Sequence, residues 1–167
     1  RCCVFNFASI RRYKPICRLI RVTDISKESS GLVDMIKRHE GVRSKVYMCS
    51  GGYETIGVGR NISDSGLGLS EKEIDFLLSN DLLRIREELL SEYRWFCTLD
   101  QVRQDAITDI SFNLGQTVLR KFKKALKAMS DRDYEKAANE FMDSRWSQQV
   151  GNRAVEVTNM IRFGEYQ

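Results

Sequence analysis

Apolar residues return at helical spacing along most of the chain, and one early stretch has a strand-like pattern instead. Over residues 29–41 they recur every three to four positions, and Gly41 suits the end of such a helix. The segments 42–47 and 53–59 flank a polar, glycine-rich tip at 49–52, which is typical of a β-hairpin. The pattern therefore predicts a helix followed by a hairpin.

The rest of the chain is predicted to be helical. Ser70 and Glu73 have the spacing of a capping box, which opens a long amphipathic helix with apolar residues through Leu89. A second capping box, Thr98 with Gln101, is predicted to precede the later helices. Breaks among these are expected at Gly115, Ser130–Asp131 and Gly151–Asn152. The predicted fold class is α+β, mostly α, with a small hairpin-bearing lobe joined by a long helix to a helical lobe.

Composition limits the possibilities further. The chain has 167 residues, 42% of them hydrophobic, which is the size of one ordinary domain. Mean hydropathy is −0.40, and no apolar run reaches the roughly 18 residues that a membrane span needs. We therefore expect no integral membrane segment.

The excess of basic residues lies at the N-terminus. Residues 1–30 contain seven basic and two acidic residues, whereas the remainder has 20 basic and 21 acidic ones. The balance of the domain gives no reason to expect a nucleic-acid partner. We predict a basic arm over 1–28, disordered or foreign to the native protein, and one domain over 29–167. A cationic handle for an anionic cell surface is the alternative for the arm.

Cysteine and histidine usage argues against metal or disulfide frameworks. Three of the five cysteines lie in the arm, which leaves Cys49 and Cys97 in the domain, and His39 is the single histidine. No Cys-x-x-Cys occurs, so neither a zinc site nor a disulfide framework is indicated, and no cofactor is implied. The arm has no apolar stretch of signal-peptide length, and we expect a protein that folds in a reducing compartment.

Candidate chemistry lies where the first helix meets the hairpin. Glu40 stands at the helix C-terminus, where the helix dipole disfavours a negative charge, which suits a carboxyl group that donates a proton. Gly57 and Gly59 alternate in a predicted strand, which indicates close approach by a ligand or by another chain segment. Cys49 lies in the polar tip. On these grounds alone, a solvated glutamate at a helix end and an inert cysteine are the alternatives, and the residues by themselves favour them.

Three spaced blocks carry a resemblance to a known family. The segment HEGVRSKVYMCSGGYETIGVGR, residues 39–60, resembles the active-site segment of the phage-type (T4-like) lysozymes, the endolysins among the glycoside hydrolases. Its Glu40, Cys49 and Thr55 fit the family's spacing of glutamate, aspartate or cysteine, and threonine. Residues 111–115 and 144–154 resemble two later family segments, so that the resemblance extends over about 29–165.

The resemblance implies an activity and a set of roles. The reaction would be hydrolysis of the β-1,4 bond between N-acetylmuramic acid and N-acetylglucosamine in bacterial peptidoglycan, for host cell lysis. Glu40 would be the general acid, Cys49 the group that activates water, and Thr55 the residue that positions the water. The implied substrate-binding residues are Phe112, Asn113, Asn152 and Arg153.

The resemblance also implies a setting. We expect a monomer that acts on peptidoglycan in a cleft between the lobes. It would need neither metal nor cofactor, and would gather in the host cytoplasm before release to the wall.

Some positions depart from the family pattern. Aspartate is commoner than cysteine at position 49, so whether Cys49 activates water or attacks carbon is open, and with it an inverting or retaining outcome. A disulfide of Cys49 with Cys17 or Cys97 is an alternative to an unregulated thiol. Arg60 stands where the family often has histidine. Ala125 and Glu140 replace a sugar-contacting hydroxyl and amide.

Two other readings remain. A catalytically silent peptidoglycan-binding protein could keep this fold without turnover, and the unusual Cys49 leaves that reading open. A Cys-dependent amidase or peptidase would need His39 beside Cys49. Because adjacent helical residues point about 100° apart, His39 and Glu40 can hardly serve one cleft.

Overall fold

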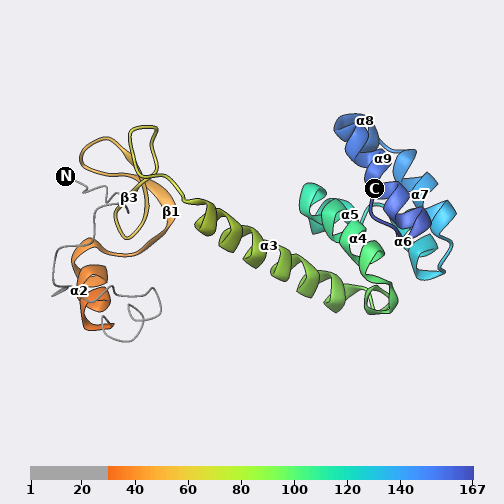
Figure 1. Cartoon of the computed structure of the whole chain (residues 1–167), viewed down its shortest axis with the longest axis horizontal. Coiled ribbons are helices and arrows are strands. Elements are labelled where there is room, and N and C mark those ends of the chain that lie inside the picture. Colours follow the sequence, from red (N-terminus) through yellow and green to blue (C-terminus); the bar gives the residue numbers. More distant parts are fainter. Residues whose placement is uncertain (1–29) are drawn as a thin grey trace, which may run out of the picture. The chain divides into compact units, whose positions relative to one another are not determined.

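The computed structural model describes residues 30–167. The chain divides into two compact units, of which the first ends at Leu69 and the second spans Ser70–Gln167 (Figure 1). The predicted arm over residues 1–28 and Cys17 lie outside the described residues. The extent of the predicted domain, 29–167, therefore stays a prediction.

The first unit contains one helix and a small antiparallel sheet. Helix α2 (Ser30–Glu40) ends as predicted at Gly41, whose φ is 76° and whose N–H donates to the Lys37 carbonyl at 3.0 Å. Strand β1 (Arg43–Met48) pairs with β2 (Glu54–Gly57), which confirms the hairpin. A third strand, β3 (Arg60–Asn61), pairs with β2 and was not predicted from the sequence.

The second unit begins with the predicted long helix, α3 (Glu71–Glu92). The carboxylate of Glu73 accepts hydrogen bonds from the backbone N–H of Ser70 at 2.8 Å and from its hydroxyl at 2.7 Å, as the capping prediction requires. The prediction of a capping box formed by Thr98 and Gln101 was wrong. Asp100 caps the following helix by accepting from the Arg103 N–H at 3.0 Å, because Thr98 lies inside the short 3-10 turn η1 (Phe96–Thr98) and donates to the Trp95 carbonyl.

Six helices complete the second unit. They are α4 (Gln101–Leu114), α5 (Gln116–Leu119), α6 (Lys123–Ser130), α7 (Tyr134–Met142), α8 (Arg145–Val150) and α9 (Asn152–Phe163). The predicted breaks at Gly115, Ser130–Asp131 and Gly151 are confirmed. Two further breaks, at 120–122 and 143–144, contain neither glycine nor proline and were not predicted.

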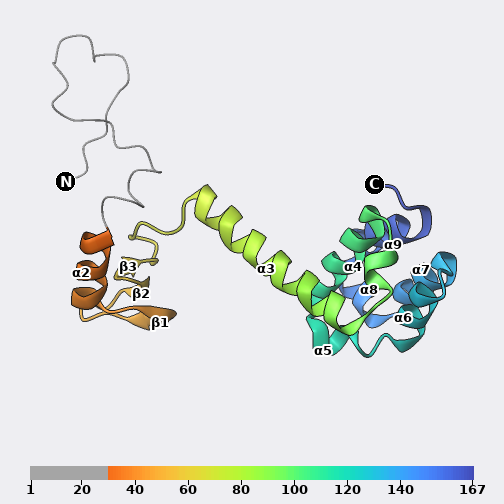
Figure 2. The same cartoon turned by 90° about the horizontal axis from the view of Figure 1, so that it is seen from below.

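The hydrophobic core lies in the second unit. Among the described residues, every buried hydrophobic side chain falls between Ile85 and Ile161, and Leu89, Ile107, Phe141 and Ile161 are completely buried. Helix α9 packs against α4 and α7, and α6 packs against α7 (Figure 2). The mostly helical α+β fold class is confirmed.

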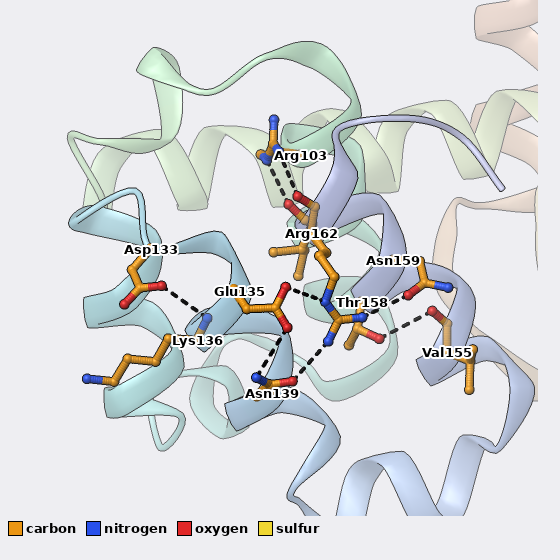
Figure 3. Close-up of polar contacts among 10 residues, drawn as sticks. Arg103, Asp133, Glu135, Lys136, Asn139, Val155, Thr158, Asn159 and Arg162 are labelled. Carbon is orange, nitrogen blue, oxygen red and sulfur yellow. Dashed lines mark hydrogen bonds and ion pairs between the residues drawn. The ribbon is translucent and has the colours of Figure 1, made fainter.

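Polar contacts hold α9 to α7 and α4. Arg162 of α9 donates to the Glu135 carboxylate at 2.8 Å and to the Asn139 side-chain oxygen at 2.9 Å (Figure 3). Arg103 of α4 donates to the carbonyls of Ile161 at 2.7 Å and Arg162 at 3.1 Å. The two Arg103 bonds satisfy carbonyls near the end of α9 that the helix itself leaves unpaired. They also fix α9, which carries two of the predicted substrate-binding residues.

Candidate active site

Glu40 is the last residue of α2, and its carboxylate lies close to the backbone of Gly59. A Cβ atom built at Gly59 would stand 3.5 Å from Oε2 of Glu40. Gly59 has a φ of 76°, in the region that favours glycine. The prediction that Gly57 and Gly59 alternate in one strand was wrong, because β2 ends at Gly57 and Gly59 lies in the turn before β3. The predicted close approach occurs at Gly59, where another chain segment makes it with the predicted acid. Gly57 also has a positive φ, 69°, but its open side has no atom within 4 Å.

Cys49 follows β1 at the tip of the hairpin. Its N–H donates to the Tyr53 carbonyl at 3.0 Å, and its carbonyl accepts from Gly52 at 2.9 Å. Hydrogen bonds from the backbone of Tyr53, from the side chain of Thr55 and from the backbone of Gly51 lower the pKa of the Cys49 thiol. The tight turn thus favours the thiolate, which is the form of cysteine that can accept a proton.

Thr55 lies on β2, opposite Tyr47 of β1, and is buried. Its hydroxyl donates to the Tyr53 carbonyl at 3.0 Å. Turned towards Cys49, the same proton can instead be donated to the thiolate, and Thr55 lowers the pKa of that thiol. A hydroxyl has one proton to donate and two lone pairs to accept with, so Thr55 serves one of these acceptors at a time and can accept a hydrogen bond from water.

Arg60 fastens the loop that follows the sheet. Its Nη1 donates to the Gly68 carbonyl at 2.8 Å, across the loop after β3. The arginine that stands in place of the family's usual histidine therefore donates a hydrogen bond to the backbone of this loop.

Phe112 and Asn113 lie at the C-terminal end of α4. Phe112 is 45% exposed. The side-chain oxygen of Asn113 accepts a 2.9 Å hydrogen bond from Nε1 of Trp146, which is only 3% exposed. Across the part of the chain that the structure describes, the Asn113 amide nitrogen has no hydrogen-bond partner, and so it is available to a ligand.

Asn152 and Arg153 begin α9. Asn152 is exposed, and Arg153 forms a two-pronged ion pair with Asp109 of α4, at 3.0 and 2.7 Å. Asp109 raises the pKa of Arg153. Sequence reasoning missed Asp109, although its place three residues before Phe112 on one helix put both on the same face.

Two of the predicted substrate-binding residues, Phe112 and Arg153, line the same cavity in the second unit. Phe112, Arg153 and Asp109 line a cavity of about 610 Å³, together with apolar side chains such as Val157 and Met160. The cavity combines an aromatic ring with a fixed cation. That combination suits a ligand with both apolar and polar faces.

The structure thus gathers the predicted site residues into two sets. Glu40, Cys49 and Thr55 lie in the first unit, and the four predicted substrate-binding residues lie in the second. Cys49 and Cys97 are free thiols. Within residues 30–167, no three His, Cys, Asp or Glu side chains converge to hold a metal ion. None of the helices described is both long and apolar enough to cross a membrane.

Comparison with known proteins places these residues in a family context. The sequence model of the family described as phage lysozyme matches residues 37–160. The pre-baseplate central spike protein of Enterobacteria phage T4 is 30% identical over 160 residues, which cover 80% of this chain and 28% of the spike protein. Probable T4-type lysozyme 1 of Dictyostelium discoideum is 28% identical over 162 residues, 81% of this chain and 95% of that protein. An endolysin of Acyrthosiphon pisum secondary endosymbiont phage 1 is 31% identical over 137 residues, 79% and 88% of the two chains.

Proposed function

Because the chain belongs to the phage lysozyme family and is therefore a glycoside hydrolase, we propose that it hydrolyses the β-1,4 bond between N-acetylmuramic acid and N-acetylglucosamine in bacterial peptidoglycan. The observation that carries this proposal is that the first unit brings Thr55 of β2 beside Cys49 at the hairpin tip and Glu40 against Gly59 in the turn before β3. A proton donor and a base formed from these side chains are what glycoside hydrolysis requires.

Glu40 acts as the general acid. It gives its proton to the glycosidic oxygen as the bond from that oxygen to the anomeric carbon breaks, and the sugar ring takes on oxocarbenium character. The leaving sugar departs with a free hydroxyl group. Gly59 leaves the Glu40 carboxylate room on the sheet side, because no side chain stands there.

Cys49 acts as the base. Its thiolate takes one proton from a water molecule while the water oxygen bonds to the anomeric carbon, so the proton that Glu40 gives up is matched by the one Cys49 gains. An ordinary thiol, with a pKa near 8.5, is only a few per cent ionised at neutral pH. The three hydrogen bonds that lower the pKa of Cys49 increase this fraction, and Thr55 orients the water.

Residues of the second unit bind the glycan. Phe112 supplies an apolar surface for a sugar ring, and the free amide nitrogen of Asn113 donates to a sugar oxygen. Asn152 and Arg153 supply further donors at the start of α9. The ion pair with Asp109 holds the Arg153 guanidinium in one orientation.

Product analysis on purified peptidoglycan tests the proposal. We expect new reducing ends without new free amines, and loss of the reducing ends in Glu40→Gln. Amines that disappear in His39→Ala would instead support the amidase or peptidase. Binding without either product would support a silent wall-binding protein.

The stereochemistry of the product tests the role of Cys49. If Cys49 activates water, the water attacks from the face opposite the leaving group and the anomeric configuration inverts. Proton NMR of the first product should therefore show the α-anomer. Initial β-anomer, with a glycosyl group trapped on the sulfur, would show that Cys49 attacks carbon.

Host cell lysis is the biological role that we propose, with the protein held in the host cytoplasm before it reaches the wall. The name of one relative, endolysin, supports this role. Fractionation of infected cells before lysis should recover the protein in the cytoplasm. Recovery in mature virus particles would contradict the proposal.

A further inference from the structure

A groove of about 530 Å³ on the second unit is lined by four lysines. Lys123, Lys124 and Lys127 come from α6, and Lys136 comes from α7. Ala128 and three carboxylates, Asp131, Asp133 and Glu140, complete its lining. We call this feature the lysine groove.

The lysines of α6 stand where helix energetics disfavour them. Lys123 and Lys124 occupy the first turn, next to the positive end of the helix dipole. Lys123 and Lys127 are like charges four residues apart, which is also unfavourable. Residues 116–130 contain five basic residues and no acidic one, although the second unit as a whole has 15 basic and 17 acidic residues. Local choices that oppose stability are expected at functional sites.

The opposite face of α6 fixes the direction of these lysines. Ala125, Leu126, Ala128 and Met129 are buried in the core, so the helix cannot turn its charged face elsewhere. Lys123, Lys124 and Lys127 lie within about 100° of one another around the helix axis. The α6 side of the groove therefore presents three ammonium groups, and the three carboxylates of the lining bring the formal charge of the whole groove to +1.

Of the four ammonium groups, one is held in an ion pair. Lys127 pairs with Asp131, and Asp133 caps α7 by accepting from the Lys136 backbone N–H at 3.2 Å. Within the described part of the chain, the ammonium groups of Lys123, Lys124 and Lys136 have no ion-pair partner. Figure 3 shows the Lys136 side chain directed away from the contacts of Glu135 and Arg162.

We propose that the lysine groove binds a linear cell-wall polyanion that carries no aromatic bases. The cell-wall setting rests on the proposed function. A groove lined by several ammonium groups suits successive charges of one extended chain, because each neutralised charge releases a counterion. Polyol phosphate and carboxylate polymers share this chemistry.

Two other anionic partners fit less well. A membrane-binding surface inserts exposed apolar side chains, and over residues 113–141 no large apolar side chain is exposed. Grooves that bind single-stranded nucleic acid use free aromatic rings on which bases stack. Here Phe122 packs against Phe141, and the guanidinium of Arg103 covers the Tyr134 ring.

Binding measurements on the full chain test the proposal. The probes are poly(glycerol phosphate) and polygalacturonate, each titrated at several salt concentrations, and the variant is Lys123→Gln/Lys124→Gln/Lys136→Gln. We expect the variant to lose affinity on the order of tenfold or more. Its log–log salt slope should fall by about 2, from roughly 0.7 per neutralised charge. The two probes tell whether phosphate or carboxylate is preferred.

A matched control removes three exposed charges of α3 and the segment after it, in Lys72→Gln/Arg84→Gln/Arg94→Gln. It should bind the probes like wild type, and both variants should retain the wild-type unfolding midpoint. An equal loss of binding in the control would overturn the proposal, as would wild type that binds neither probe. Tighter lysine-dependent binding to phosphatidylglycerol vesicles or to a thymidine oligonucleotide would also overturn it.

Turnover of peptidoglycan stripped of attached polyanions separates this proposal from the lysozyme mechanism. Both variants should cleave that substrate at the wild-type rate. If neither the wild-type protein nor either variant cleaves stripped peptidoglycan, the proposed lysozyme mechanism fails, whatever the binding measurements show. If the groove variant alone loses turnover on stripped peptidoglycan, the groove belongs to the glycan site and the polyanion proposal fails.

Discussion

The indole N–H of Trp146 donates a 2.9 Å hydrogen bond to the side-chain oxygen of Asn113, 33 residues earlier in the chain. The bond uses the acceptor of the Asn113 amide and leaves its nitrogen free. One residue thereby completes the core around a buried tryptophan and offers a donor to a ligand. The bond to Trp146 and the proposed contact with substrate can be tested separately by substitution.

Asn113→Ala should lower the free energy of unfolding by about 1–3 kcal/mol, because it leaves a buried indole N–H without a partner. Asn113→Asp keeps the accepting oxygen and removes only the amide donor. We expect it to unfold like wild type near neutral pH but to have a several-fold higher KM on peptidoglycan fragments. Denaturant unfolding and steady-state kinetics check both; an unchanged KM in Asn113→Asp would remove Asn113 from the substrate contacts.

The hydrogen bonds around Cys49 predict the acidic limb of the pH–rate profile. In the proposed mechanism the active form is the thiolate, so the rate should rise as the pH rises through the pKa of Cys49, and a lowered pKa moves that rise to lower pH. Thr55→Val removes one of the stabilising donors and should move the limb to higher pH, whereas Thr55→Ser should restore it. Cys49→Asp should move the limb to lower pH, because aspartate ionises near pH 4.

Superimposable acidic limbs in wild type and Cys49→Asp would show that Cys49 is not the base. The alkaline limb serves as the internal control. It reports loss of the proton that the general acid donates, and neither substitution should move it far.

Gly59 and Gly57 form a matched pair for testing the approach to Glu40. Alanine at either position is strained by a positive φ, at a cost of about 1–2 kcal/mol. Only at Gly59 does the new methyl group meet the Glu40 carboxylate, at 3.5 Å. We expect similar destabilisation in the two variants, but a clearly larger fall in kcat in Gly59→Ala; equal kcat values would contradict a catalytic role for this contact.

The ion pair between Asp109 and Arg153 predicts coupled effects on substrate binding. Both side chains are partly exposed, so Asp109→Asn should cost less than about 1 kcal/mol in stability. The substitution removes the carboxylate that orients the Arg153 guanidinium, and KM for peptidoglycan fragments should therefore rise several-fold. In a double-mutant cycle with Arg153→Gln the two effects should not add; additive effects would mean that Asp109 does not position Arg153.

Glu92 links α3 to the segment after α5 and predicts a response to acid. Its carboxylate accepts from Arg120 at 2.8–3.0 Å and from Gln116 at 2.9 Å, and the Arg120 guanidinium is the main cause that lowers the pKa of Glu92 to about 2. A carboxyl whose pKa is lowered by folding stabilises the fold above its unfolded pKa, about 4.5. That contribution is lost as the pH falls towards 2.

Glu92→Gln should therefore reduce the unfolding midpoint at pH 7. Because the pair is partly exposed, the reduction should be small, about 3 °C or less. The difference from wild type should shrink between pH 4.5 and 2. Thermal unfolding across this range checks the prediction, and a difference that does not change with pH would assign the effect to packing.

Much of the local structure followed from the sequence, because its signals lie within a few residues. The end of α2 at Gly41, the capping of α3 by Ser70 and Glu73, and the hairpin around residues 49–52 need only short-range backbone geometry. The set of Glu40, Cys49 and Thr55 came instead from the resemblance of residues 39–60 to the active-site segment of the phage-type lysozymes. Thr98 shows the limit of such reasoning: it lies inside the 3-10 turn η1, and Asp100, which the sequence analysis did not consider, caps α4 instead.

The tertiary structure alone decided the contacts between residues that are distant in sequence. Strand β3 is two residues long and exists only because β2 offers it a pairing edge. Asp109 meets Arg153 across 44 positions, and Asn113 meets Trp146 across 33. Periodicity shows which face of a helix is buried, but not which polar side chain on a packed neighbour lies opposite. That depends on how the helices pack, and no local pattern encodes it.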